Sequence, residues 1–138
     1  EIPPMVNQVE THVFNQQREA RKFMDEFGTH IMAWAPLAEG RNGLFANPTL
    51  VQVGEKYGKT AAQIALRWLL QSGVILIPKT THKERMEENL NLFDFELTPE
   101  DMQTIASLDT AHSLFFDHHD GEVAKLFMEW RSIVTPAE

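Results

Sequence analysis

An apolar run followed by cationic and hydroxyl side chains lies in the second half of the chain. Residues 74–77 are all apolar, which is typical of a strand buried on both faces of a parallel sheet. Lys79 and Thr80 follow closely, and Arg85 comes shortly after them. An ammonium, a hydroxyl and a guanidinium this close together are suited to a dianionic phosphate. The alternative is an ordinary strand-to-helix connection with solvated charges.

A capping-box pattern follows this cationic turn. Thr81 and Glu84 have the required spacing, so a helix is expected to begin there and to run from His82 to about Asn91. The unpaired amides at the start of a helix attract anions. They would therefore add to the phosphate site.

Two side chains in the first quarter of the chain could contact a ligand. Gln8 is polar within the strand-like run 5–10, and Trp34 lies near the end of a second strand, 31–35. Each also has an ordinary explanation on its own. A buried glutamine can be satisfied by neighbouring backbone, and a tryptophan in such a pattern usually packs in the core.

Helices are expected between and after these strands. Asn15 predicts the start of a first helix, which reaches about Phe27 with an apolar face at helical spacing (Ala20, Phe23, Met24 and Phe27). A turn-rich loop spans 38–47. Capping and proline signals place further helices at 48–57, 60–71 and 98–108. A last amphipathic helix, carrying Val123, Leu126, Phe127 and Trp130, is expected to lie over the body.

Strands separated by helices predict parallel pairing with right-handed crossovers. Three strands are too few for a parallel barrel, which needs about eight. The chain begins at Glu1 and enters a strand within a few residues. It is therefore expected to be part of a larger protein.

Bulk composition excludes several classes of function. The chain has 138 residues, 43% hydrophobic and 23% charged, with a net charge of −8, so a nucleic-acid-binding surface is not expected. It has no cysteine, and no apolar run approaches membrane-spanning length. These properties favour a cytoplasmic protein that does not contact a membrane.

The segment Asp117-His118-His119-Asp120 contains metal-ligand residue types. Adjacent residues rarely converge on one ion, and ligating pairs on a helix are usually three or four residues apart. We therefore interpret the segment as a polar loop and expect no metal site.

Three segments together resemble the C-terminal part of an aldo-keto reductase. They are residues 6–10 with His12; Ala33-Trp34-Ala35-Pro36-Leu37; and Ile77-Pro78-Lys79-Thr80 with Arg85, Glu88-Asn89 and residues 93–97. The resemblance implies an α/β fold: strands 6–8 of a parallel (β/α)8 TIM barrel, incomplete in this chain. It makes residues 1–138 a single cofactor-binding domain, with residues 112–138 as a C-terminal loop and helix extension.

The resemblance also implies an NADP(H) cofactor and a small carbonyl substrate. Gln8 would bind the nicotinamide carboxamide and Trp34 would stack on the ring. The turn at Ala35 and the amides near Leu37 would hold the pyrophosphate. The far end of the cofactor would be bound by Lys79, Thr80 and Arg85 at the 2′-phosphate and by Glu88 and Asn89 at the adenine.

The chain departs from the family pattern at several positions. Ala35 replaces a common serine, Thr11 and Val13 flank His12 in place of the usual residues, and the role of His82 is open. The tail would bring His118 or His119 near the substrate opening.

The largest departure concerns catalysis. No segment matches the family's Asp, Tyr, Lys and His tetrad, and Tyr57, the only tyrosine, falls on a helix away from the site. The chain alone is therefore expected to be inactive. The alternatives are a non-catalytic NADPH-binding half-barrel or an inactive truncation product. Unpaired strand edges predict self-association, or assembly with a chain that carries the missing half.

Overall fold

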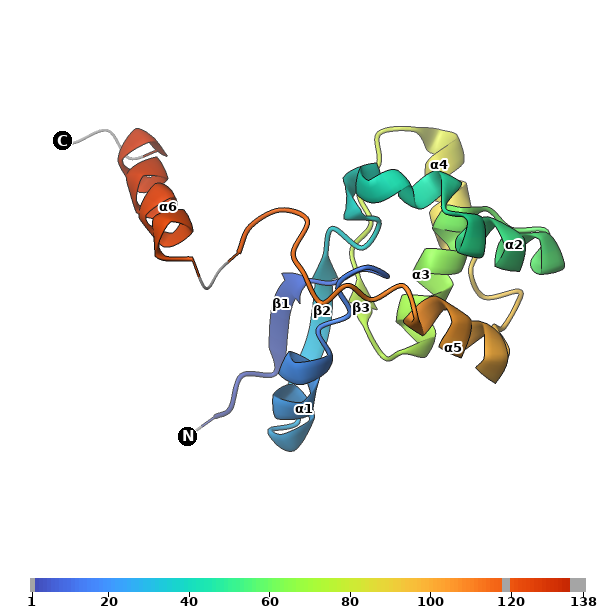
Figure 1. The fold of residues 1–138 in the computed structure, drawn as a ribbon, viewed down its shortest axis with the longest axis horizontal. Coiled ribbons are helices and arrows are strands. Elements are labelled where there is room, and N and C mark those ends of the chain that lie inside the picture. The colour runs from blue at the N-terminus through green and yellow to red at the C-terminus, as the bar shows by residue number, and fades with distance from the viewer. Residues whose placement is uncertain (1, 118–119, 135–138) are drawn as a thin grey trace.

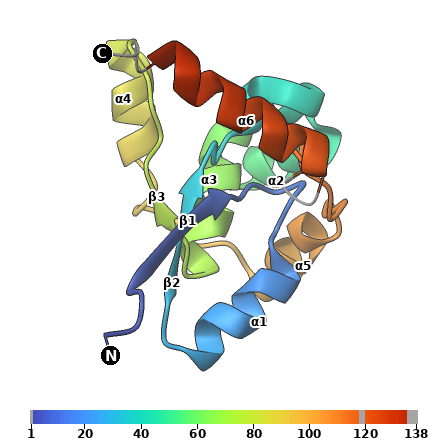
Figure 2. The ribbon, with the colours of Figure 1, turned by 90° about the vertical axis from the view of Figure 1, so that its left-hand side faces the viewer.

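The computed structural model describes residues 2–117 and 120–134 (Figure 1). Its centre is a parallel sheet of three strands, β1 (Val6–Glu10), β2 (His30–Trp34) and β3 (Ile75–Leu76), in the order β1-β2-β3. The strands lie side by side in both views (Figures 1 and 2). The expected parallel pairing is confirmed.

Six α-helices and one 3-10 segment connect and follow the strands in the described part of the chain. They are α1 (Arg18–Glu26), η1 (Ala38–Ala46), α2 (Pro48–Tyr57), α3 (Ala61–Gln71), α4 (Lys83–Leu90), α5 (Pro99–Ala106) and α6 (Gly121–Val134). Within the described ranges no helix is long and apolar enough to cross a membrane.

Helix α3 is the centre of the hydrophobic core. Ile64 and Leu69 are fully buried there, in one cluster with Ile31 and Ala33 of β2. The Trp68 indole N–H donates to the carbonyl of Met102, 3.0 Å away, and so ties α3 to α5. Helices α2, α3 and α5 lie to one side of the sheet, as Figure 1 shows.

Several helix starts form as their sequence signals predict. The Asn47 side chain accepts from the amides of Thr49 and Leu50 at 3.1 and 3.2 Å, directly before the proline that opens α2. Thr60 and Gln63 form a complete capping box at α3. These local hydrogen bonds satisfy amides that have no partner inside the helix.

Two expected caps are wrong. Helix α1 begins at Arg18 with Gln17 at its cap, because Asn15 is held in a β-bridge with His12 instead. Helix α4 has His82 at its cap with no side-chain hydrogen bond, so the capping box expected from Thr81 does not form. There the hydroxyl of Thr80 accepts from the His82 amide at 3.1 Å and turns the chain earlier.

Two burial predictions are also wrong. Only Met24 is buried in α1, while Phe23 and Phe27 are 64% and 63% exposed, because this helix lies at the margin of the sheet. The third strand was expected over 74–77 and buried on both faces, yet Ile75 and Ile77 are 39% and 47% exposed. As an outer strand, β3 is covered only on the side that faces the helices.

Helix α6 forms as expected but does not lie over the body. Figure 1 shows it apart from the other helices, on the opposite side of the sheet. Leu126 and Met128 are 42% and 69% exposed, and Phe127 packs edge-on against Phe116 with centroids 5.0 Å apart. The side chain of Trp130 lies outside the described residues. Ser113 and Leu114, in the segment before α6, are hydrogen-bonded to Glu10 at the end of β1.

A buried carboxylate joins α2 to α5. Asp101 is 2% exposed and accepts from the Lys56 ammonium, the Tyr57 hydroxyl (2.6 Å) and the Thr98 hydroxyl (3.2 Å). Burial by itself raises the pKa of Asp101, but these hydrogen bonds outweigh it and the net pKa is lowered. The sole tyrosine therefore has a structural role.

We expect Asp101→Asn to reduce the free energy of unfolding by about 1–3 kcal/mol, because an amide cannot accept from all three donors. The contribution of Asp101 should be present near neutral pH and lost as the pH falls below 3.8 through the lowered folded-state pKa. Urea unfolding at two pH values measures both effects. Glu100→Gln, on the exposed neighbour, is the control, and equal losses in the two variants would contradict the assignment.

Candidate functional site

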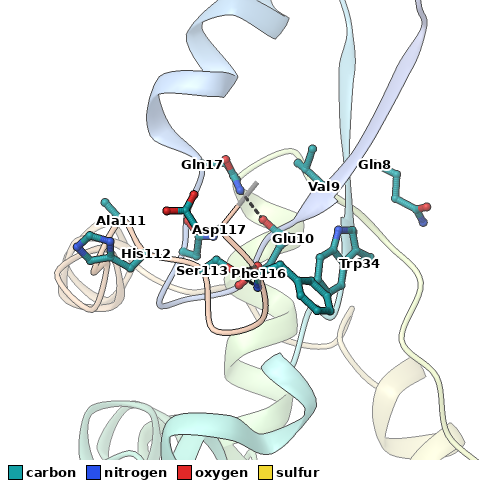
Figure 3. Close-up of a pocket in the computed structure, with 11 residues that line it drawn as sticks. Gln8, Val9, Glu10, Gln17, Trp34, Ala111, His112, Ser113, Phe116 and Asp117 are labelled. Atoms are coloured by element: carbon teal, nitrogen blue, oxygen red, sulfur yellow. Dashed lines mark hydrogen bonds between the residues drawn. The ribbon is translucent and has the colours of Figure 1, made fainter. Parts of the chain in front are cut away.

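A cavity of about 620 Å³ opens at the carboxyl ends of β1 and β2 (Figure 3). In a strand, alternate side chains share a face, and the register pairs Gln8 with Met32 and Glu10 with Trp34. Gln8, Glu10 and Trp34 therefore lie on the face of the sheet away from the core helices. The wall is completed by Val9, Asn15, Gln17, Ala111, His112, Ser113, Phe116 and Asp117.

Trp34 presents a half-buried ring in this cavity. Phe115 meets it edge-on, with centroids 5.0 Å apart and planes at 65°, and the Phe116 centroid is 6.5 Å away. Figure 3 shows Phe116 beside Trp34. The exposed Gln8 amide contacts only weakly, its nitrogen lying 3.5 Å from the Met32 sulfur. An aromatic face and an exposed amide are thus available to one ligand.

Glu10 is a site residue that the sequence reasoning missed. It lines the cavity and is 3% exposed, and its carboxylate oxygen lies 2.9 Å from Nε2 of the fully buried His12. The signal was its position two residues after Gln8, which puts both side chains on one face of the strand.

Glu10 and His12 titrate away from their ordinary values. Burial raises the pKa of Glu10, but hydrogen bonds from Ser113, the Leu114 amide and His12 outweigh it, so the net pKa is lowered. Burial lowers the pKa of His12, and the partly opposing effect of Glu10 does not restore it. Near neutral pH the pair is a carboxylate beside a neutral imidazole.

A second cavity, of about 410 Å³, gathers six of the nine sequence-predicted cofactor residues. These are Leu37, Lys79, Thr80, Arg85, Glu88 and Asn89, with Glu39, Phe45, Thr60, Ala61 and Ala62 completing the wall. Gln8 and Trp34 lie in the first cavity. The lining of neither cavity includes Ala35.

Positive charge in the second cavity is available to a ligand. Among residues 2–117 and 120–134, Lys79 and Arg85 take part in no ion pair. Of the two carboxylates there, Glu88 accepts from the Thr60 hydroxyl and Glu39 lies 3.8 Å from Arg41. Helix α4 also starts here without a side-chain cap, so its first amides are open to an anion.

The loop between the two cavities has an unusual backbone. Ala35, Ala38, Glu39 and Asn42 all have φ between 50° and 54°, a region that is costly for residues other than glycine. The Ala35 carbonyl accepts from the Ala38 amide at 2.7 Å and closes a tight turn directly after Trp34. Ala35 therefore shapes the turn rather than lining a cavity. Leu37, two residues on, reaches the second cavity.

Other candidate residues are not part of either cavity or cannot be placed. His82 is an exposed cap residue. Tyr57 is held by Asp101 on the helical side of the molecule. His118 and His119 lie outside the described residues, and the described residues contain no group of three side chains able to hold a metal.

Sequence comparison places the chain in a known family. The sequence profile of the Aldo/keto reductase family matches residues 1–110. An aldo-keto reductase of Mycobacterium sp. (strain JLS) is 46% identical over 113 residues, covering 82% of this chain. A glyoxal reductase of Bacillus subtilis (strain 168) is 47% identical over 109 residues, covering 79%. The chain spans 40% and 39% of the length of these relatives.

Solved structures agree with the sequence relatives. MGS-M4, an aldo-keto reductase enzyme from a deep-sea metagenome library, superposes with a TM-score of 0.81 at 39% identity, over 85% of this chain and 44% of its own. A mutant of Gox0644 in complex with NADPH gives a TM-score of 0.75 at 39% identity, over 78% of this chain and 39% of its own. With the profile match over most of its length, the chain belongs to the aldo/keto reductase family.

Proposed function

We propose that this chain is the C-terminal, cofactor-binding part of an NADP(H)-dependent aldo-keto reductase. Residues 1–138 would form one domain containing barrel strands 6–8, with residues 112–138 as a C-terminal loop and helix extension. The observation that carries the proposal is the cavity in which Lys79 and Arg85 lie without ion-pair partners among the described residues. The reductase relatives favour this over a non-catalytic binding module.

The two cavities suit opposite ends of one dinucleotide. The first offers the Trp34 face and the Gln8 amide, which suit a planar nicotinamide ring and its carboxamide. The second offers Lys79, Thr80 and Arg85, which suit the 2′-phosphate.

The strained loop connects these two ends. Its turn at Ala35 follows Trp34, and Leu37 lines the second cavity, so amides near Leu37 would meet the pyrophosphate. Asn89 and Glu88, on the inner side of α4, would contact the adenine.

In the whole enzyme, NADP(H) would supply a hydride to an aldehyde or ketone. Trp34 and Gln8 would hold the ring so that one face is turned toward the carbonyl. An acid must protonate the developing alkoxide, and the family's tetrad has no counterpart in this sequence. Tyr57 is unsuitable because its hydroxyl already donates to Asp101.

Lys79→Ala and Arg85→Ala should each weaken NADPH binding by about 10-fold or more. Each variant loses the binding free energy of one charge-assisted hydrogen bond to the phosphate. Binding of NADH, which lacks the 2′-phosphate, should barely change. Calorimetric titration of the purified chain measures both ligands.

Lys83→Ala is the matched control for this titration, since Lys83 is exposed and lines neither cavity. The 2′-phosphate assignment fails if NADPH and NADH lose affinity equally. The proposed function fails if NADPH does not bind the unaltered chain.

The purified chain should not oxidise NADPH in the presence of a generic aldehyde, because no segment of its sequence matches the family's catalytic tetrad. Loss of absorbance at the nicotinamide band measures turnover. Steady oxidation that depends on the aldehyde would show that the chain carries its own acid.

We also infer that the sheet edges pair with other strands. In the described part of the chain, β1 and β3 are outer strands. Met5, just before β1, and Val6, its first residue, are 68% and 43% exposed. Such edges recruit further strands. The partner is either a second copy or a chain bearing the remaining barrel strands.

Sedimentation of the purified chain should therefore show concentration-dependent self-association. A single monomeric species across the whole accessible concentration range would contradict the inference. Charged substitution at Val6, on the exposed edge, should shift the distribution toward monomer.

A further inference from the structure

A buried carboxylate at the mouth of the first cavity has no part in the cofactor role described above. Glu10 accepts from the Leu114 amide at 2.9 Å, from the Ser113 hydroxyl and from His12 Nε2 at 2.9 Å. More than a hundred residues separate Glu10 from Ser113 and Leu114 along the chain. The end of β1 is thus joined to the C-terminal tail.

Ser113 extends this attachment along the tail. Its hydroxyl donates to Glu10 and accepts from the amides of Phe115 and Phe116, at 3.0 and 2.8 Å. The carboxylate therefore orients the hydroxyl, and the hydroxyl sets the backbone that carries both aromatic rings. Through these hydrogen bonds, the buried carboxylate of Glu10 orders residues 113–116.

Arg41, from the loop after β2, holds the same tail from the other side. Its guanidinium donates to the Leu114 carbonyl at 2.6 Å and lies 4.0 Å from the centroid of the Phe115 ring. Leu114 is thus fixed through its amide by Glu10 and through its carbonyl by Arg41. Phe115 is left edge-on to Trp34.

The tautomer of His12 supports this role for Glu10. The Phe14 amide donates to His12 Nδ1 at 3.2 Å, so the imidazole proton sits on Nε2 and points to the Glu10 carboxylate. The other charged groups near His12 are Asp109, which favours its charged form, and Arg18, which pairs with Asp109 at 2.8 Å. Because this imidazole is neutral, it does not neutralise Glu10. The negative charge of Glu10 is therefore available to the hydrogen-bond donors of the tail, the Ser113 hydroxyl and the Leu114 amide.

We propose that Glu10 is a positioning residue that fastens segment 113–116, so that Phe116 lines the Trp34 cavity and Phe115 packs edge-on against Trp34. The rings of Phe115 and Phe116 would determine how a planar ligand ring stacks on Trp34. The attachment of segment 113–116 to Glu10 is argued from hydrogen bonds alone. Its expected effect on ligand binding rests on the proposed cofactor function. Glu10 would act on the ligand through the tail, because its carboxylate already accepts from His12, Ser113 and Leu114.

Hydrogen exchange read by mass spectrometry tests the fastening directly. In Glu10→Ala, the amides of 114–116 should exchange at least about 10-fold faster. The Leu114 amide loses its charged acceptor, and the Ser113 hydroxyl, which accepts from the amides of Phe115 and Phe116, loses the carboxylate that orients it. Amides of α3 should keep their protection. The matched control is Glu26→Gln, at the exposed end of α1.

If Glu10→Ala loosens the whole chain, Ser113→Ala provides the second variant, since it removes the relay while the carboxylate keeps two donors. Faster exchange confined to 115–116 is expected there. Unchanged exchange of 113–116 in the folded variants would overturn the proposal.

Ligand titration separates positioning from general stability. Glu10→Ala should weaken NADPH several-fold but leave 2′,5′-ADP, which lacks the nicotinamide half, within about twofold. Equal weakening of both ligands, or of neither, would overturn the positioning role. If the unaltered chain binds neither ligand, the cofactor function and the ligand effect both fail, while exchange still decides whether Glu10 fastens the tail.

Discussion

The parallel register between β1 and β2 is the constraint on which the rest of the site depends. It sets Gln8 beside Met32 and Glu10 beside Trp34, all on the face turned away from the core helices. A slip of β1 by one residue would turn Gln8 and Glu10 into the core and bring Val9 to the open face. Fully buried core residues such as Ala33 and Ile64 oppose such a slip, so packing on one face determines the chemistry on the other.

The loops that follow the strands contribute to different parts of the site. The strained loop after Trp34 leads from the aromatic cavity to the cationic one, and Arg41 within it also holds the tail at Leu114. The loop after β3 supplies Lys79 and Arg85. Loops at the carboxyl ends of parallel strands form the sites of barrel enzymes, and the described cavities lie at these ends. Unpaired cations and open helix amides are tolerated there because Lys79, Arg85 and the start of α4 are exposed to water.

Much of the fold and of the cationic cavity could be predicted from local pattern. Asn47 and Thr60 opened their helices as expected, and Lys79, Thr80, Arg85 and Asn89 were brought to one cavity. The errors came where a competing contact or the limits of packing overrode the expected signal. Asn15 was drawn into a bridge with His12, and the Thr81 capping box gave way to a turn held by Thr80. Phe23 and Phe27 have helical spacing, but α1 lies where little remains to cover them.

The sequence by itself determined the order of strands and helices, the parallel sheet and the family, because periodicity, capping residues and motifs act over short stretches of chain. Only the tertiary structure decided what Glu10 does. Its partners Ser113 and Leu114 are distant in sequence, and no local spacing signals a hydrogen bond between them. The same holds for the separation into two cavities and for the placement of Phe115 against Trp34. Burial of a charge is stable only where the whole fold supplies its donors, so that role becomes visible only when the chain is folded.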